Sequence, residues 1–137
     1  MKPDLFLVHS YSMIIKNDIL NIPRLGGLNI HASLLPKYRG CNPIEWAIIN
    51  NEKKTGATLH KLTANLDSGK ILLQLKTPIK KHETWRDINK KVSILNEKIL
   101  KIARILIARK KLNGTAQDHK KATYYPRRIF LLAIADI

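Results

Sequence analysis

Three polar side chains are spaced so that they could act together on a carbonyl group. Asn29 and His31 are two residues apart in an apolar segment, and side chains two apart on a strand point to the same face. Asp67 follows 38 positions after Asn29 (67 − 29 = 38), in a loop that ends in Ser68-Gly69. An amide, an imidazole and a carboxylate at one end of a sheet can polarise a carbonyl, move a proton and orient the base.

The segments around these residues predict four strands. Apolar or alternating runs indicate strands at Asp4–Val8, Leu28–His31, Thr55–Leu62 and Ile71–Ile79. The first run follows Pro3 and is apolar throughout, which is typical of a strand buried on both faces of a parallel sheet. Polar residues leave its carboxyl end, where open α/β sheets place their ligands.

Helix signals lie between and after these strands. Asn42-Pro43-Ile44-Glu45 predicts a helix start with Asn42 as the cap and Glu45 answering it, and the helix ends near Asn50. Thr84 to Asp87 has the pattern of a capping box before a long amphipathic helix, which Gly114 is placed to end. Its apolar stripe is formed by Ile88, Val92, Leu95, Ile99, Ile102 and Leu106. Met13 to Leu20 predicts one or two helical turns.

Several ordered motifs in one register resemble a known family. They are Asn29-x-His31-x-Ser33-Leu34-Leu35-Pro36, Tyr38-Arg39-Gly40-x-x-Pro43, Thr55-Gly56-x-Thr58 and Asp67-x-Gly69. Together they closely resemble the catalytic core of the folate-dependent formyltransferases. That family includes methionyl-tRNA formyltransferase, glycinamide ribonucleotide formyltransferase, the sugar N-formyltransferases and formyltetrahydrofolate hydrolase. The resemblance runs from about residue 3 to about residue 128 and covers the second half of the family's catalytic domain.

The resemblance implies an α/β fold, a partial Rossmann-like sheet with flanking helices from which the N-terminal half is absent. We expect residues 1–128 to form the catalytic core and residues 129–137 (IFLLAIADI) to form an atypical apolar tail. An apolar edge strand at Asp4–Val8 would then be open to association. The chain would pair with a separate N-terminal fragment, self-associate through that edge, or be a remnant with an incomplete site.

The resemblance also implies a reaction, the transfer of a formyl group from 10-formyltetrahydrofolate to an amine. Asn29 would donate a hydrogen bond to the developing oxyanion, and His31 would stabilise it and help to move the amine proton. Asp67 would orient His31 and assist proton delivery to the leaving folate nitrogen, with no metal required. The positions that match the family's folate pocket are Val8, Met13, Ile14, Ile15, Ile19 and Asp67; the apolar ones could equally be ordinary core.

The formyl acceptor is less closely defined. Tyr38-Arg39-Gly40-x-x-Pro43 and the segment Ala122 to Arg128 look most like the sugar and tRNA enzymes. A nucleotide-linked amino sugar is the favoured acceptor and initiator methionyl-tRNA the second. A third candidate function is hydrolysis of formyltetrahydrofolate, with water in place of the amine. A fourth is an inactive or folate-binding remnant that needs a partner fragment.

Composition limits the classes of protein further. The 137 residues are 45% hydrophobic and include one cysteine, so we expect one globular domain without an internal disulfide or thiolate metal site. No signal peptide and no apolar run of about 20 residues, the length of a membrane span, is present, and we expect a reducing cytoplasm.

The formal net charge is +15, and residues 80–121 hold 13 Lys or Arg against four acids. This favours a solvated helix face, with a footprint for tRNA or another polyanion as the alternative.

Three residues near the motifs keep simpler interpretations open. Ser33 is expected to shape its loop, because no nucleophile-elbow motif surrounds it. Arg39 could stack on or pair with a substrate, or be a solvated loop arginine. His60 lies on a predicted strand, but no metal-ligand motif links it to His31.

Overall fold

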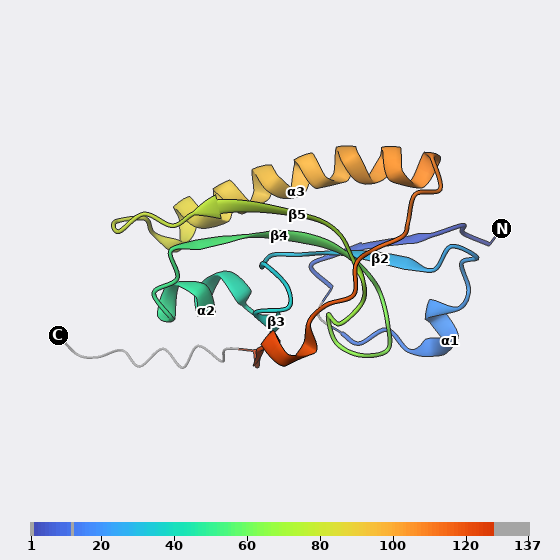
Figure 1. Ribbon diagram of the computed structural model, residues 1–137, viewed down its shortest axis with the longest axis horizontal. Helices are drawn as coiled ribbons and strands as arrows, with labels where there is room; N and C mark the ends of the chain where they lie inside the picture. The colour runs from blue at the N-terminus through green and yellow to red at the C-terminus, as the bar shows by residue number, and fades with distance from the viewer. Residues whose placement is uncertain (1, 12, 128–137) are drawn as a thin grey trace.

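The computed structural model describes residues 2–11 and 13–127, and its centre is a four-stranded sheet. The strands are β1 (Phe6–His9), β2 (Gly27–His31), β4 (Lys54–Lys61) and β5 (Ile71–Pro78). They lie in the order β1-β2-β4-β5, with β1 parallel to β2 and the other two pairs antiparallel (Figure 1). The predicted α/β class and all four predicted strands are confirmed, and the sheet is mixed rather than parallel throughout.

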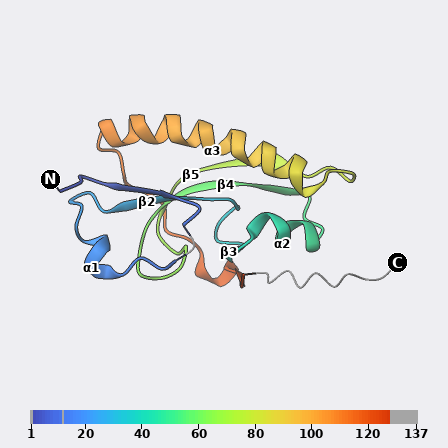
Figure 2. The same cartoon turned by 180° about the vertical axis from the view of Figure 1, so that it is seen from behind.

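In the part of the chain that the structure describes, three α-helices flank this sheet. The longest is α3 (Trp85–Ala108), which runs across β4 and β5; α1 (Asn17–Leu20) and α2 (Pro43–Ile49) are short (Figures 1 and 2). The predicted capping box is present at the start of α3, where Thr84 accepts from the Asp87 N–H and Asp87 accepts from the Thr84 N–H. Within the described residues, no helix is long and apolar enough to cross a membrane.

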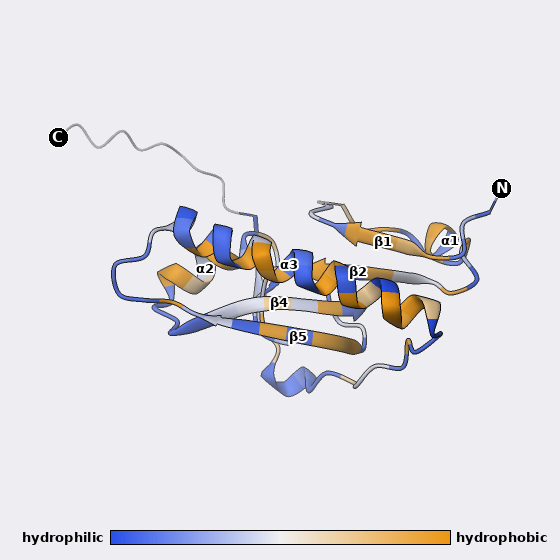
Figure 3. Cartoon of the chain, turned by 90° about the horizontal axis from the view of Figure 1, so that it is seen from above, coloured by the Kyte–Doolittle hydropathy of each residue, from blue (hydrophilic) through white to orange (hydrophobic). Residues whose placement is uncertain are grey.

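The core lies between α3 and the sheet. Leu28 and Ile30 of β2 and Ala57 and Leu59 of β4 are buried against one face of α3. That face is formed by Ile88, Val92, Ile99 and Ala103, with Leu95 and Leu106 partly buried beside them. The predicted stripe is therefore largely confirmed, with Ala103 in place of Ile102 in the buried cluster. Apolar residues accordingly recur along one side of α3 in Figure 3.

β1 differs from its prediction. Its burial alternates, and Leu7 is 41% exposed, so the strand is not buried on both faces. The reason is its position: among the described residues, β1 is an edge of the sheet and pairs with β2 alone. The predicted apolar edge strand is present.

A second, two-stranded sheet was not predicted. It pairs β3 (Arg39–Gly40) in parallel with β6 (Tyr124–Tyr125), just after the 3-10 turn η1 (His119–Lys121). Tyr125 stacks on Tyr38, with ring centroids 5.0 Å apart. The segment after α3 thus returns across the molecule and packs beside the loop that follows β2. The expected domain boundary at residue 128 and the tail 129–137 lie outside the described residues.

The start of α2 also differs from the predicted cap. Pro43 is the first helical residue as expected, but Asn42 has a left-handed backbone with φ of 53°. Its side-chain amide donates to Glu45 Oε1 at 3.1 Å, so the two side chains bond to each other at the helix start.

Candidate active site

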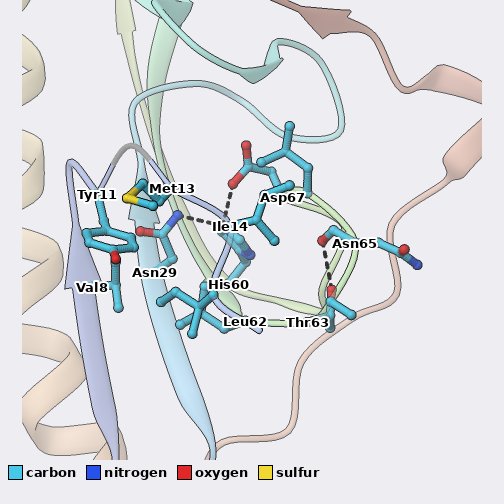
Figure 4. A pocket seen from close by; sticks show the side chains of 13 residues that line it. Val8, Tyr11, Met13, Ile14, Asn29, His60, Leu62, Thr63, Asn65 and Asp67 are labelled. Carbon is cyan, nitrogen blue, oxygen red and sulfur yellow. Dashed lines mark hydrogen bonds and ion pairs between the residues drawn. The ribbon is translucent and has the colours of Figure 1, made fainter. Parts of the chain in front are cut away.

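The three predicted catalytic side chains converge at the carboxyl end of β2. Asn29 and His31 are contributed by β2, and Asp67 reaches them from the loop between β4 and β5. His31 Nδ1 lies 3.7 Å from Asp67 Oδ2. Asn29 is connected to Asp67 through His60, whose Nε2 lies 3.2 Å from Asn29 Nδ2 and 3.6 Å from Asp67 Oδ1 (Figure 4).

His31 is buried and its tautomer follows from its neighbour. Its Nε2 lies 2.7 Å from the carbonyl oxygen of Tyr38, which can only accept, so Nε2 carries a proton. The neutral ring therefore presents the lone pair of Nδ1 to Asp67. Burial lowers the pKa of His31, and this outweighs the opposing effect of the Asp67 charge. His31 is accordingly a neutral base at neutral pH.

Asp67 remains ionised despite its burial. Desolvation alone would raise the pKa of Asp67, but three groups lower it below the ordinary value: a protonated His60 ring, which can donate to the carboxylate, the charge of a protonated His31 ring, and the Gly40 N–H. The Gly40 N–H donates to Asp67 Oδ2 at 2.8 Å. Gly40 has φ of +98°, and a Cβ there would lie 2.3 Å from the Tyr125 carbonyl oxygen, so only glycine fits at this donor.

His60 is a member of the cluster that sequence reasoning missed. The Nδ1 atom of His60 lies 2.9 Å from the carbonyl oxygen of Lys61, which can only accept, so Nδ1 donates. In the neutral ring Nε2 then accepts from the Asn29 amide. This bond fixes which way the amide faces and leaves its second N–H for another acceptor. Asn29 and His60 are direct partners in the antiparallel register of β2 and β4, which the sequence pattern does not reveal.

Two hollows open on this cluster. The smaller, of about 60 Å³, is lined by His60 and by five of the predicted folate-pocket residues, Val8, Met13, Ile14, Ile15 and Asp67. The larger, of about 590 Å³, is lined by His31 as well as Trp85 and Arg127. Asn29 and Asp67 line both hollows. The structure thus brings two adjacent spaces together at the amide and the carboxylate.

Ile19 is the exception among the predicted pocket residues. It lies on α1 with a side chain 44% exposed, and it does not line either hollow. Its position matches the family's folate pocket in the sequence, but here α1 directs its side chain to solvent.

Comparison with known proteins identifies the family of this chain. A family model described as "Formyl transferase" matches residues 1–103, which is most of the chain. The chain belongs to the formyl transferase family. The resemblance found in the sequence motifs is therefore confirmed, and with it the fold, a formyltransferase α/β fold of which this chain covers a part.

Two curated relatives illustrate the match. This formyl transferase chain is 40% identical over 128 residues to the bifunctional polymyxin resistance protein ArnA of Wigglesworthia glossinidia brevipalpis, covering 93% of the chain and 20% of ArnA. It is 40% identical over 126 residues to methionyl-tRNA formyltransferase of Alkaliphilus oremlandii, covering 92% of the chain and 41% of that enzyme. The chain spans less than half the length of either relative.

This chain covers a larger share of one solved structure. The formyltransferase PseJ from Anoxybacillus kamchatkensis superposes with a TM-score of 0.81 at 27% identity, covering 90% of this chain and 64% of PseJ. PseJ was crystallised in complex with UDP-4,6-dideoxy-4-formamido-L-AltNAc and tetrahydrofolate.

The nearby loop residues have clear structural roles. Ser33 Oγ donates to the Lys37 carbonyl oxygen at 2.8 Å, so its predicted loop-shaping role is confirmed.

Both interpretations of Arg39 were wrong, because its side chain is only 1% exposed and is held by Gln117, His119 and Tyr124. Gln117, which donates to the Asp67 loop, was not considered from the sequence.

Proposed function

We propose that this chain transfers a formyl group from 10-formyltetrahydrofolate to the amine of a nucleotide-linked amino sugar. The observation that carries the proposal is the pair of hollows that share Asn29 and Asp67. A group transfer needs a donor site and an acceptor site that meet at the reacting atoms. The family shown above supports a formyl group as the cargo.

The smaller hollow suits the donor. Its rim carries Met13 and Ile14, which are 69% and 68% exposed, beside Tyr11, which is 57% exposed. Large apolar side chains gathered in the open commonly mark a binding surface. A flat ring system such as a pterin would cover them, and its polar edge would face Asp67 and the loop before it. The tetrahydrofolate in the PseJ complex supports this class of donor.

The chemistry follows from the protonation states of the cluster. 10-Formyltetrahydrofolate would supply the formyl carbon. Asn29, whose amide is oriented by His60, would donate its remaining N–H to the formyl oxygen as charge develops there. His31 Nδ1, which carries a lone pair, would take the proton of the attacking amine. Asp67 would stabilise the resulting imidazolium of His31. It would then help to deliver a proton to the leaving nitrogen of the folate.

The larger hollow suits the acceptor. His31 lies on its wall, so a bound amine would reach the proposed base from this side. Arg127 supplies a cation for a phosphate, and Trp85, which is 44% exposed, supplies an aromatic surface. The UDP-linked sugar in the PseJ complex supports an acceptor of this class.

Methionyl-tRNA is the second candidate acceptor. It is favoured by the methionyl-tRNA formyltransferase relative and by the formal net charge of +15. Exposed basic side chains, such as Lys90, Lys98 and Arg104, lie along α3. Binding through them would fall steeply as the salt concentration rises.

A direct assay distinguishes these acceptors. The purified chain is incubated with 10-formyltetrahydrofolate and either a UDP-linked amino sugar or initiator methionyl-tRNA, and formylation of each is followed by mass spectrometry. We expect the sugar to gain a formyl group, and Asn29→Ala and His31→Ala each to reduce the rate by at least about 100-fold. Formylation of the tRNA alone would replace the proposed acceptor. Donor binding without transfer to either would overturn the proposed activity of this chain.

A further inference from the structure

A buried arginine lies behind the catalytic cluster without a carboxylate partner. Arg39 is 1% exposed, and none of the ion pairs among the described residues includes it. Its guanidinium donates to Gln117 Oε1 from Nη2 at 2.7 Å and from Nε at 3.2 Å, and to His119 Nδ1 at 3.0 Å. Tyr124 covers it, with the guanidinium carbon 5.2 Å from the ring centroid. A buried charge held only by neutral groups is costly, so these partners must be fixed in place.

Gln117 uses all of its hydrogen-bonding capacity in this position. Its oxygen accepts both guanidinium N–H groups, and its Nε2 donates to the carbonyl oxygens of Asp67 and Gly69, each at 2.8 Å. A reversed amide would place its oxygen against two carbonyls and its nitrogen against a cation. The guanidinium therefore dictates that the Gln117 amide points its donors at the Asp67 loop.

The loop that Gln117 holds is exposed at its tip, where Thr63, Asn65 and Ser68 bond to one another. Residues 63–66 are exposed, and Asp67 has a left-handed backbone with φ of 48°. Gly69 packs so closely that a Cβ would lie 1.9 Å from the Lys61 carbonyl oxygen. The two Gln117 bonds fall on either side of Ser68, at the base of this loop. They fix the main chain from which the Asp67 carboxylate projects.

Three consecutive residues, 38–40, thus form hydrogen bonds with His31, Asp67 and Gln117. The Tyr38 carbonyl accepts from His31 Nε2, the Gly40 N–H donates to the Asp67 carboxylate, and Arg39 between them holds Gln117. The C-terminal segment that carries Gln117 is itself paired to β3, through the bond from the Arg39 N–H to the Thr123 carbonyl oxygen at 2.9 Å.

We propose that Gln117, oriented by Arg39, is a positioning residue that holds the Asp67 carboxylate at its distance from His31. The inference deepens the proposed function, in which Asp67 stabilises the protonated form of His31. The segment after α3 is then part of the active site, although it supplies no group to the reacting atoms.

The test is an NMR titration of the His31 ring in the full chain, with no folate present. We expect Asp67→Asn to lower the pKa of His31, because a negative charge facing the ring is removed. Gln117→Asn is too short to hold both Arg39 and the loop, and should lower the pKa in the same direction by a smaller amount. In the Asp67→Asn background, Gln117→Asn should cause no additional shift. The exposed His82 serves as the reference and should not change.

A second variant protects the test against a folding defect. Gln117→Glu keeps an acceptor oxygen for Arg39 but cannot donate to the carbonyl oxygens of Asp67 and Gly69, so it isolates the loop contact. Here we expect the Gly40 N–H, which donates to Asp67, to exchange with solvent at least about tenfold faster than in the unaltered chain. Unchanged Gly40 exchange, or a His31 shift of equal size with and without Asp67, would overturn the proposal. Neither readout depends on folate binding, so failure of the proposed function is distinguishable from failure of this inference.

Discussion

The buried pair of His31 and Asp67 makes protonation and folding interdependent. His31 is neutral because burial lowers its pKa, and Asp67 is charged because its neighbours lower its pKa further than burial raises it. Both shifts have the same consequence for stability. The unfolded chain binds protons more readily than the folded chain, so acid favours unfolding.

The residue-scale prediction concerns this pH dependence. The free energy of unfolding should fall as the pH drops below about 6.5, where His31 of the unfolded chain begins to take up a proton. A further loss should follow at lower pH, as Asp67 is forced to protonate. Urea denaturation at a series of pH values measures the slope, and His31→Gln should flatten it near pH 6.

The matched control is His82→Gln, which removes an exposed imidazole and should leave the slope unchanged. A His31→Gln chain that keeps the full pH dependence would contradict the assignment of this effect to His31.

At the scale of elements, α3 and the sheet carry the stability. Ile99 is fully buried against the sheet, whereas Ile105 on the same helix is 51% exposed. We expect Ile99→Ala to lower the free energy of unfolding by about 2–5 kcal/mol, because it leaves a cavity in the core. Ile105→Ala should change it by less than about 0.5 kcal/mol. Equal effects of the two substitutions on the urea midpoint would contradict this packing.

The same elements explain how much the sequence could predict. Periodicity and capping residues located the four main strands, α2 and α3, because these signals are local. Asn29, His31 and Asp67 were found because their motifs lie in one register. His60, Gln117 and the β3–β6 pair were missed, since strand register and the return of the chain after α3 depend on contacts between distant residues. Arg39 was misjudged for the same reason, because its burial is set by residues that follow it by about 80 positions.

At the scale of the whole molecule, the notable feature is the open edge of the sheet at β1. Its outer side has no strand partner among the described residues, and Leu7 is 41% exposed. The chain spans 20% and 41% of the two curated relatives and 64% of PseJ. We propose that this edge pairs with another polypeptide segment, either a separate fragment or a second copy of the chain.

Self-association of the isolated chain tests that proposal. Sedimentation velocity should report a larger species as concentration rises, and Leu7→Lys should shift the distribution to monomer. Leu100→Lys, at an equally exposed apolar position on α3, is the control and should have no effect. A chain that is monomeric at every concentration, and that binds no added N-terminal fragment of a relative, would contradict the proposed pairing.

The measurement that bears most directly on function is calorimetric binding of 5-formyltetrahydrofolate, a stable folate, to the purified chain. We predict binding that Asp67→Asn weakens by about tenfold or more, about 1.4 kcal/mol, while Asp118→Asn, at an exposed acid, leaves it unchanged. That result would mean that the donor half of the site is assembled in this chain. A chain that is folded by circular dichroism and binds no folate would contradict the proposed formyl transfer by this chain alone.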